Sequence, residues 1–281
     1  MVPELQDKAA IDEALHTAAE RVHGTLDGWP RQYGWHYKSA GTRVRIGSGA
    51  FWLRVAREGD PPGNERLWHG IRAAEAIDGV RKPQLLDEYE WVDAGWRYRA
   101  DLMTLITEAP CSATPDLHSD APVDDEWFTA LRRSLDNLAQ VQTSRVNTRQ
   151  DLVSRRIAER FGAGVDATVN VWTTAHGDLH WANVTNPGAW IFDWEGWGTA
   201  PLGLDAAFLL CFSVAVPAAT TRVAATFSRV LGTPDGLRSQ LFACAELLRM
   251  IDLHGDHPHL REPLEIHAGI VLRQLHQVTP Q

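Results

Sequence analysis

The chain has 281 residues, of which 44% are hydrophobic and 22% charged, and its formal net charge is -9 at pH 7. This length is enough for a sizeable core in two domains or one two-lobed unit, and the composition is that of an ordinary soluble globular protein. Surfaces that bind nucleic acid are usually basic, so the acidity argues against a DNA or RNA partner and suits a cationic substrate.

The sequence predicts a cytoplasmic, reduced protein without a membrane partner. The N-terminus lacks the basic start and apolar run of an export signal. The longest apolar stretch, 206–219, contains Pro217 and is too short to cross a membrane, so we expect it to form a buried helix. Cys111, Cys211 and Cys244 are far apart and odd in number, which favours buried free thiols over disulfides.

The first part of the chain alternates between helical and strand-like patterns. Apolar residues recur at helical spacing near the N-terminus, and short alternating segments separated by glycines follow. The predicted elements are a helix over 4–25, a three-stranded meander over 31–57, a helix from an N-cap at Asn64 to 77, and strands over 83–92 and 96–106.

The remainder of the chain is mostly helical. A polar, proline-rich stretch over 108–125 predicts a loop between two lobes. Helices are then predicted over 127–141, 151–161, 204–216, 218–230, 237–254 and 263–275. The sequence therefore predicts an α+β protein with an N-terminal lobe over 1–106 and a helical C-terminal lobe over 107–281.

One motif interrupts the helical half and carries the chemistry. It reads His176-Gly-Asp-Leu-His-Trp-Ala-Asn183 and is followed by Ile191-Phe-Asp-Trp-Glu195, in which Asp193 comes directly after a predicted short strand over 189–192. This is the spacing of a kinase catalytic loop with a second aspartate downstream. Asp178 is placed to accept the proton of an attacking hydroxyl, and Asn183 and Asp193 are placed to hold Mg²⁺ against the phosphates of a nucleotide.

This motif resembles the signature of the aminoglycoside phosphotransferase and choline kinase-like family, tightly over 176–205 and more loosely elsewhere. The resemblance implies a protein kinase-like fold, with a small antiparallel-sheet N-lobe that binds the nucleotide and a larger helical C-lobe. It also implies ATP or GTP as co-substrate, Mg²⁺ as cofactor, and a buttress for the catalytic loop at Asp205. In the family, the residue equivalent to His176 orders this loop.

A zinc site is a weaker interpretation of the same motif. His176 and His180 are four residues apart, as in metalloprotease helices, but the intervening residues lack the glutamate of His-Glu-x-x-His. The asparagine and aspartate that follow suit magnesium better.

The residues that would bind the nucleotide are less clearly indicated by the sequence. Kinases of this shape hold the phosphates with a strand lysine paired to a helix glutamate. Arg54 stands at that place here, with Glu65 or Glu75 as the partner, and Lys38 or Arg45 as the alternative cation. Residues 38–41 form either a phosphate-covering turn or a plain hairpin. By family order, the adenine lies along the backbone at Asp101, Met103 and Leu105.

The acceptor side rests on acidic and aromatic residues. Glu195 either meets a cationic substrate or forms a surface ion pair. Trp181 and Trp197, in a tryptophan-rich segment, form either an aromatic surface for a cation or part of the core. On the C-terminal helices Glu246, Asp252 and Asp256 either bind amines or belong to a solvated face.

Three functions are compatible with these features. The first is a resistance kinase that phosphorylates a hydroxyl of a cationic antibiotic, either an aminoglycoside or a basic peptide of the capreomycin and viomycin type. The second is a metabolic kinase for choline, an amino sugar or another small amino alcohol. The third is a nucleotide-binding scaffold without catalysis, which only Arg54 in place of lysine supports. For each, we expect a monomer or weak homodimer.

Overall fold

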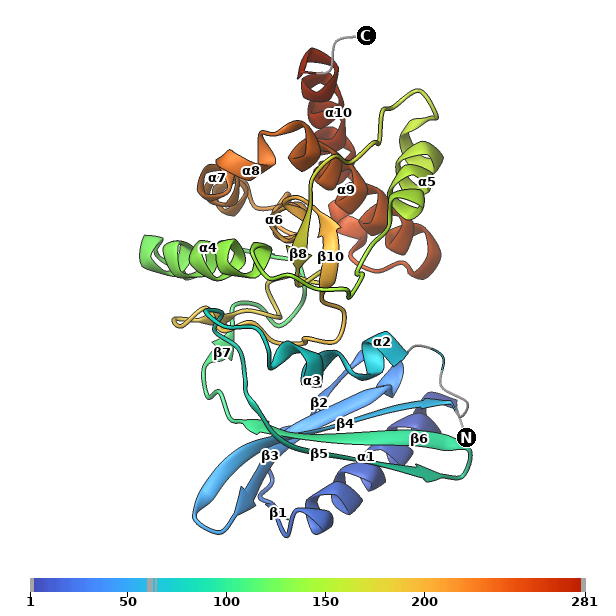
Figure 1. Cartoon of the computed structure of the whole chain (residues 1–281), viewed down its shortest axis with the longest axis vertical. Helices are drawn as coiled ribbons and strands as arrows, with labels where there is room; N and C mark the ends of the chain where they lie inside the picture. Colours follow the sequence, from blue (N-terminus) through green and yellow to red (C-terminus); the bar gives the residue numbers. More distant parts are fainter. Residues whose placement is uncertain (1–2, 60–62, 64, 279–281) are drawn as a thin grey trace. The chain divides into compact units, whose positions relative to one another are not determined.

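The computed structural model describes residues 3–59, 63 and 65–278, and within them the chain forms two compact units. Met1–Glu75 with Pro83–Thr107 make up the first, here the sheet unit, and Ala76–Lys82 with Glu108–Gln281 make up the second, here the helical unit. Figure 1 shows an antiparallel sheet in the first and mainly helices in the second. The predicted α+β class is confirmed.

The sheet unit is built on a six-stranded antiparallel sheet. Its strand order is β1-β3-β4-β6-β5, and β2 pairs with β3. The elements are α1 (Pro3–Arg21), β1 (Thr25–Leu26), β2 (Gln32–Tyr33), η1 (Trp35–Tyr37), β3 (Ser39–Ile46), β4 (Gly49–Gly59), α2 (Glu65–Trp68), α3 (Gly70–Ala74), β5 (Leu85–Asp93) and β6 (Trp96–Thr104).

The two faces of this sheet differ in chemistry. Because side chains alternate along a strand, Leu53 and Val55 on β4 face the same way and pack in one core with Ile11 and Leu15 of α1. The opposite face carries Arg54 and its register partner Asp101, beneath the short helices. The sheet is therefore apolar against α1 and charged against α2 and α3.

The single helix predicted to end at 77 is two short helices. Its expected N-cap, Asn64, lies outside the described residues. The break falls at His69, whose φ of -96° and ψ of 13° are not helical, and the next residue is a glycine, a poor helix former.

The helical unit contains seven α-helices among its described residues. Its elements are β7 (Ala109–Pro110), α4 (Asp125–Ala139), α5 (Gln150–Phe161), β8 (Trp172–Ala175), β9 (Thr185–Asn186), β10 (Gly198–Pro201), α6 (Leu204–Cys211), α7 (Pro217–Thr226), α8 (Ser228–Leu231), α9 (Pro234–His254), η2 (Pro258–Leu260) and α10 (Arg261–Val278). The helices predicted over 204–216 and 218–230 are thus shorter or divided. None of the helices in the described part of the chain combines the length and apolarity that crossing a bilayer requires.

The long helix α9 organises this unit, since α5, α6 and α10 all pack against it. Its start is set by local chemistry: Thr233 accepts a hydrogen bond from the Gly236 N–H, and Pro234 occupies the first turn. On its buried face the thiols of Cys244 and of Cys211 on α6 lie 3.5 Å apart, and both are free, as expected. Cys111 is also free but only partly buried.

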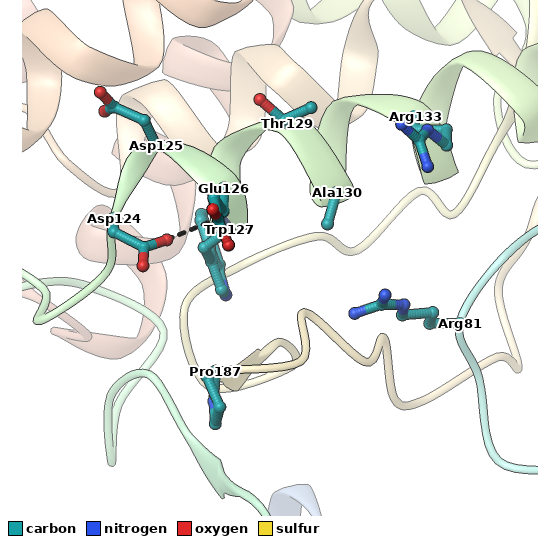
Figure 2. Close-up of a pocket in the computed structure, with 9 residues that line it drawn as sticks. All are labelled: Arg81, Asp124, Asp125, Glu126, Trp127, Thr129, Ala130, Arg133 and Pro187. Atoms are coloured by element: carbon teal, nitrogen blue, oxygen red, sulfur yellow. Dashed lines mark hydrogen bonds between the residues drawn. The ribbon is translucent and has the colours of Figure 1, made fainter.

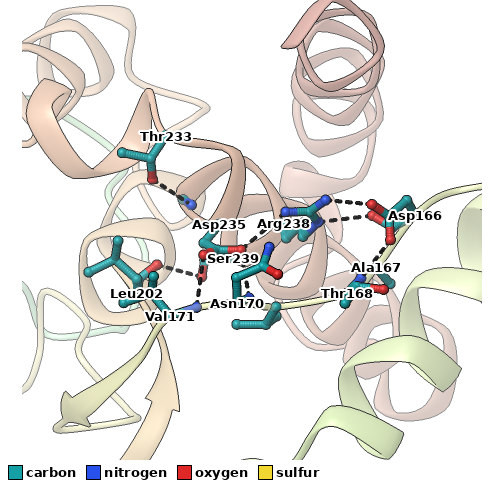
Figure 3. A network of polar contacts seen from close by, with 12 residues as sticks. Asp166, Ala167, Thr168, Asn170, Val171, Leu202, Thr233, Asp235, Arg238 and Ser239 are labelled. Atoms are coloured by element: carbon teal, nitrogen blue, oxygen red, sulfur yellow. Dashed lines mark hydrogen bonds and ion pairs between the residues drawn. The ribbon is translucent and has the colours of Figure 1, made fainter. Parts of the chain in front are cut away.

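A buried ion-pair network joins α9 to the segment that enters β8 (Figure 3). Arg238 contacts Asp235 at 3.1 Å and Asp166 at 2.6 Å. Asp235 also accepts hydrogen bonds from the backbone N–H groups of Asn170 and Val171, at 3.1 and 2.9 Å. The network fixes where β8 begins, and β8 leads directly into the motif at 176.

We predict that Asp235→Ala lowers the free energy of unfolding by about 3–5 kcal/mol, because it strips a buried arginine of one partner and leaves two backbone donors without an acceptor. Chemical denaturation measures the change. The control is Arg249→Ala, which breaks a partly exposed pair with Glu246 and is expected to cost about 1 kcal/mol or less. Equal losses in the two variants would show that the network does not anchor the fold.

Candidate active site

The motif at 176 is held by its backbone. β8 pairs with β10, so that Ala175 lies opposite Gly198, and the chain then turns at Gly177. Asp205, in the first turn of α6, accepts hydrogen bonds from the His176 and Gly177 N–H groups, both at 2.8 Å. One buried carboxylate therefore fixes the two residues that precede Asp178.

His176 fastens the second half of the motif to the first. Its side chain is fully buried, and its Nε2–H donates to the carbonyl oxygen of Phe192 at 2.8 Å. The ring also packs edge-on against Trp194, with centroids 4.9 Å apart. With no access to solvent and one nitrogen committed to a backbone carbonyl, this histidine is suited to ordering the loop rather than to carrying protons.

Asp178, Asn183 and Asp193 lie in loops that hydrogen-bond to each other. The Asn183 side-chain amide donates to the Asp178 carbonyl at 3.0 Å, and the Phe192 N–H donates to the Asn183 carbonyl at 2.8 Å. Because Asn183 uses its NH₂ group here, its side-chain oxygen keeps its acceptor capacity. The exposed Asp193 follows Phe192 directly. The three residues that the sequence singled out are thus adjacent.

The strand predicted over 189–192 is not formed. Only Ile191 makes a bridge, to Val184. Ala189 and Asp193 both have positive φ, at 51° and 62°, and such left-handed residues interrupt extended pairing. The left-handed turn at Asp193 also marks a strained position for a non-glycine residue, which is a common feature of functional sites.

Asp178 is electrostatically destabilised as an anion. Enclosure by surrounding protein and the negative charges of Asp193, Asp205 and Glu195 raise the pKa of its carboxyl well above the usual value. Solvent still reaches 60% of the side chain. A cation placed between these carboxylates would relieve the repulsion and favour ionised Asp178.

His180 stays neutral beside this carboxylate. Its Nε2 lies 3.9 Å from an Asp178 oxygen. Burial, followed by the nearby His176 and His257, lowers the pKa of His180 to about 4. The zinc interpretation gains no support, because the Nε2–H of His176 already donates to the Phe192 carbonyl.

Two residues that sequence reasoning missed support the loop. Asn147 donates to the Gly196 carbonyl at 2.9 Å, and Arg145 donates to the Glu195 and Trp197 carbonyls at 3.0 and 3.2 Å. Both lie some thirty residues before the motif. No spacing rule connects them to it, so only the folded chain reveals their role.

In the sheet unit, Arg54 pairs with Asp101 rather than with Glu65. The Arg54–Asp101 distance is 3.5 Å, and Arg99 lies closer to the same carboxylate, at 2.9 Å. Glu65 pairs instead with Arg97 at 2.7 Å and with His69 at 3.0 Å, so the expected Arg54–Glu65 pair is wrong in this state. The short α2 turns Glu65 toward the β6 end that carries Arg97.

The other expected nucleotide residues occupy distinct parts of the sheet. Arg45 lies toward the β3–β4 hairpin and pairs with Asp27 at 3.1 Å. Lys38 is exposed and immediately precedes β3, so 38–41 is the start of a strand and not a hairpin turn. Met103 is buried on β6 and Leu105 is partly buried just beyond its end.

The residues expected to bind the acceptor are mostly engaged elsewhere. Trp181 is fully buried, stacks on Trp127 with centroids 5.6 Å apart and donates to Ser213. Trp197 is also buried, with the Arg145 guanidinium 4.8 Å from its ring centroid. The prediction that these two tryptophans form an aromatic surface for a cation is therefore wrong, because both are buried in the core.

The acidic residues of α9 are likewise committed to arginines. Glu246 pairs with Arg156 at 2.5 Å and with Arg249 at 2.9 Å. Asp252 pairs with Arg160 and Arg261, at 3.1 and 2.6 Å. Both carboxylates are thus engaged in ion pairs with arginines of the same unit. The prediction that they bind amines of the acceptor is wrong, and their role here is structural. Glu195 is partly buried next to Trp194 and acts on the pKa of Asp178.

A shallow pocket of about 480 Å³ lies elsewhere in the helical unit (Figure 2). Arg81 and Pro187 lie opposite α4, which carries most of the other lining residues. Several of its polar groups already have internal roles: Asp124 caps α4 through the Trp127 N–H, and Arg81 donates to the Gly188 carbonyl. None of the motif residues lines this pocket.

No protein-family model and no curated protein matches the chain. Solved structures with a similar fold include a spectinomycin phosphotransferase in complex with ADP and spectinomycin (12% identity, TM-score 0.44, 96% of this chain and 94% of that chain). Others are a protein assigned as a fructosamine-3-kinase from Haemophilus somnus 129PT (10%, 0.49, 97% and 99%) and a MAP kinase from Leishmania major (12%, 0.38, 97% and 89%). At TM-scores below 0.5, these likenesses assign no activity to this chain.

We predict that Gly177→Ala destabilises the protein by about 2–4 kcal/mol, since φ is +83° and a Cβ would strike the Asn147 side chain. Denaturant unfolding measures the loss. Gly164→Ala is the matched control, because a Cβ there meets open space. The double variant Gly177→Ala with Asn147→Ala should recover part of the loss. A Gly177→Ala variant as stable as the control would contradict the packing described.

We also predict that His180 makes stability pH-dependent. Its folded pKa is about 4 and its ordinary value is 6.5. Between these values the unfolded chain binds the extra proton, so stability is lost as the pH falls from 6.5 toward 4. At pH 5 the loss is about 2 kcal/mol. The stability difference between pH 7 and 5 should shrink by that amount in His180→Gln and stay unchanged in His276→Gln, a substitution at an exposed site.

Proposed function

We propose that the protein is a magnesium-dependent O-phosphotransferase, which moves the γ-phosphate of a nucleoside triphosphate to a hydroxyl of a cationic small molecule. The observation that carries the proposal is the arrangement of Asp178, Asn183 and Asp193 in two mutually hydrogen-bonded loops. Asp205 and His176 hold these loops from within. Pre-positioned oxygen groups are what phosphoryl transfer requires of a protein.

The donor set at Asn183 and Asp193 fits a magnesium ion. Magnesium prefers hard oxygen ligands and takes only one or two of them from the protein. Asp193 supplies an exposed carboxylate, and Asn183 supplies an amide oxygen whose NH₂ group is already bonded to the Asp178 carbonyl. When bound, the ion would neutralise charge on the transferred phosphate.

Asp178 then serves as the group that receives and orients the acceptor hydroxyl. Its carboxylate is open to solvent, and no described residue donates a hydrogen bond to it. His180, kept neutral by its lowered pKa, does not hold it in an ion pair. A general base must be ionised, and binding of a cation at the neighbouring ligands favours this form.

The nucleotide phosphates are assigned to Arg54. Arg99 lies closer to Asp101 than Arg54 does, so Asp101 has a second cation if Arg54 turns to an anionic ligand. Arginine can bind phosphate oxygens through two N–H groups at once. We assign the nucleotide base to the backbone from Asp101 to Leu105, which runs along the last part of β6 and just beyond its end.

A cationic acceptor follows from charge. The chain is acidic overall, and Asp178, Asp193 and Glu195 place three carboxylates close together. Glu195 is the acidic residue of the motif that neither magnesium nor the hydroxyl requires. Cationic antibiotics carry several amines beside their hydroxyl groups, so an antibiotic phosphotransferase is the first form of this proposal to test, and amino alcohols and amino sugars are the second.

The test is consumption of ATP and GTP with Mg²⁺ across cationic antibiotics, amino sugars and amino alcohols. We expect transfer to one scaffold, and Asp178→Asn should lower its rate by about 10²–10⁴-fold while leaving nucleotide affinity unchanged. Asp252→Asn is the control, since this carboxylate belongs to a surface ion pair. In Asp193→Asn, transfer should require a higher magnesium concentration.

Each outcome has a definite meaning. Turnover on an antibiotic that is lost in Asp178→Asn supports the resistance form, and turnover only on a metabolite supports the metabolic form. Near-normal turnover in Asp178→Asn would remove it as the base. Nucleotide binding without transfer to any acceptor would replace the proposal with a non-catalytic scaffold.

A further inference from the structure

A second group of ligand-type side chains lies in the helical unit, apart from the motif residues. Asp116 and His118 belong to the segment that follows β7, and His257 and His259 belong to the connection between α9 and α10. The Asp116 side chain is fully buried. Three imidazole nitrogens surround its carboxylate: His257 Nδ1 at 2.7 Å, His259 Nε2 at 2.8 Å and His118 Nε2 at 3.2 Å.

These short contacts are not hydrogen bonds. Neither carboxylate oxygen of Asp116 has a hydrogen-bond partner of acceptable geometry among the described residues. A buried carboxylate without a well-aligned hydrogen bond is costly, and native structures rarely tolerate one without a compensating group. The three nitrogens are close enough to form ion pairs with the carboxylate, but none of them donates a well-aligned hydrogen bond to it.

The spacing fits ligands that share one metal ion. Asp116, His118 and His259 each offer one ligand atom, and these atoms all lie within 4.8 Å of one another. Bonds of about 2.0–2.2 Å to a metal in tetrahedral geometry place neighbouring ligand atoms about 3.3–3.6 Å apart. The His118–Asp116 distance of 3.2 Å lies just below this range, and the His259–Asp116 distance of 2.8 Å has to open by about half an ångström.

We propose that Asp116, His118 and His259 bind a divalent transition metal of the zinc class, with His257 as the outer partner of the coordinating carboxylate. Two imidazoles and one carboxylate suit zinc and its neighbours and do not suit magnesium. An imidazole that contacts the far oxygen of a ligating carboxylate is a common supporting arrangement. His118 and His259 are 65% and 37% exposed, so a metal can enter from solvent.

The site would brace the segment that lies along the catalytic loop. The Pro115 carbonyl accepts a hydrogen bond from the Trp181 N–H, and the Leu117 N–H donates to the Phe212 carbonyl. Phe212 in turn packs against the rings of His180 and His257. A metal at Asp116 would tie the α9–α10 connection to this segment, without sharing a ligand with Asn183 or Asp193.

The experiment uses the full chain, freed of metal with a chelator and titrated with Co²⁺, whose visible absorption reports its ligands. We expect one Co²⁺ per chain, displaced by Zn²⁺, and a rise in melting temperature on binding. His118→Gln and His259→Gln should each weaken binding by at least about 10–100-fold. The control is His276→Gln, at an exposed histidine on α10. Circular dichroism of the metal-free variants checks their folding.

Three results would overturn the proposal, and none depends on phosphate transfer. They are absence of a one-to-one complex at micromolar metal, equal affinity in the two ligand variants and the wild type, and a sulfur-to-cobalt charge-transfer band. The last would place the metal at Cys211, Cys244 and His267, which form another group of convergent ligand atoms.

Discussion

The candidate site depends on one buried carboxylate. Asp205 takes the backbone N–H groups of His176 and Gly177 on its two oxygens and so sets the direction in which Asp178 leaves β8. The His176 ring can then reach the Phe192 carbonyl, and this contact carries the second loop and Asp193. Burial makes the ionised form of Asp205 costly, and two short hydrogen bonds from backbone donors offset part of that cost. Asp178 and Asp193 remain exposed, while Asp205 and His176, which hold their loops, are buried.

Much of the fold could be predicted because its signals are local. The alternation of β4, the turn before β6 and the periodicity of α9 lie within a few residues, and each gave an element near its observed place. The failures were also local in cause. The helix predicted over 204–216 stops at Cys211, and left-handed residues at Ala189 and Asp193 reduce a predicted strand to one bridge. Apolar content does not reveal such backbone breaks.

The predictions for the candidate site also succeeded where the signal was local and failed where it was not. The spacing of Asp178, Asn183 and Asp193 lies within one short motif, and the structure brings these residues together. The predictions at Glu246 and Asp252 failed in part because of partners far away in sequence: Glu246 meets Arg156, 90 residues earlier, and Asp252 meets Arg160, 92 residues earlier. The sequence shows that Trp181 stands in the motif, but its burial depends on Trp127, whose helix is separated from the motif by a long connection. Residue type cannot distinguish a free carboxylate from one neutralised across the fold.

Four carboxylates of the helical unit show two contrasting electrostatic environments. Those at Asp235, Glu246 and Asp252 are matched by arginines, which stabilise the anion and leave little attraction for a ligand. Asp178 is surrounded by like charges that disfavour its ionised form. Repulsion of this kind is relieved when the carboxyl takes up a proton or when a cation binds nearby. The paired carboxylates hold elements of the fold together, whereas Asp178 lies among other carboxylates of the motif.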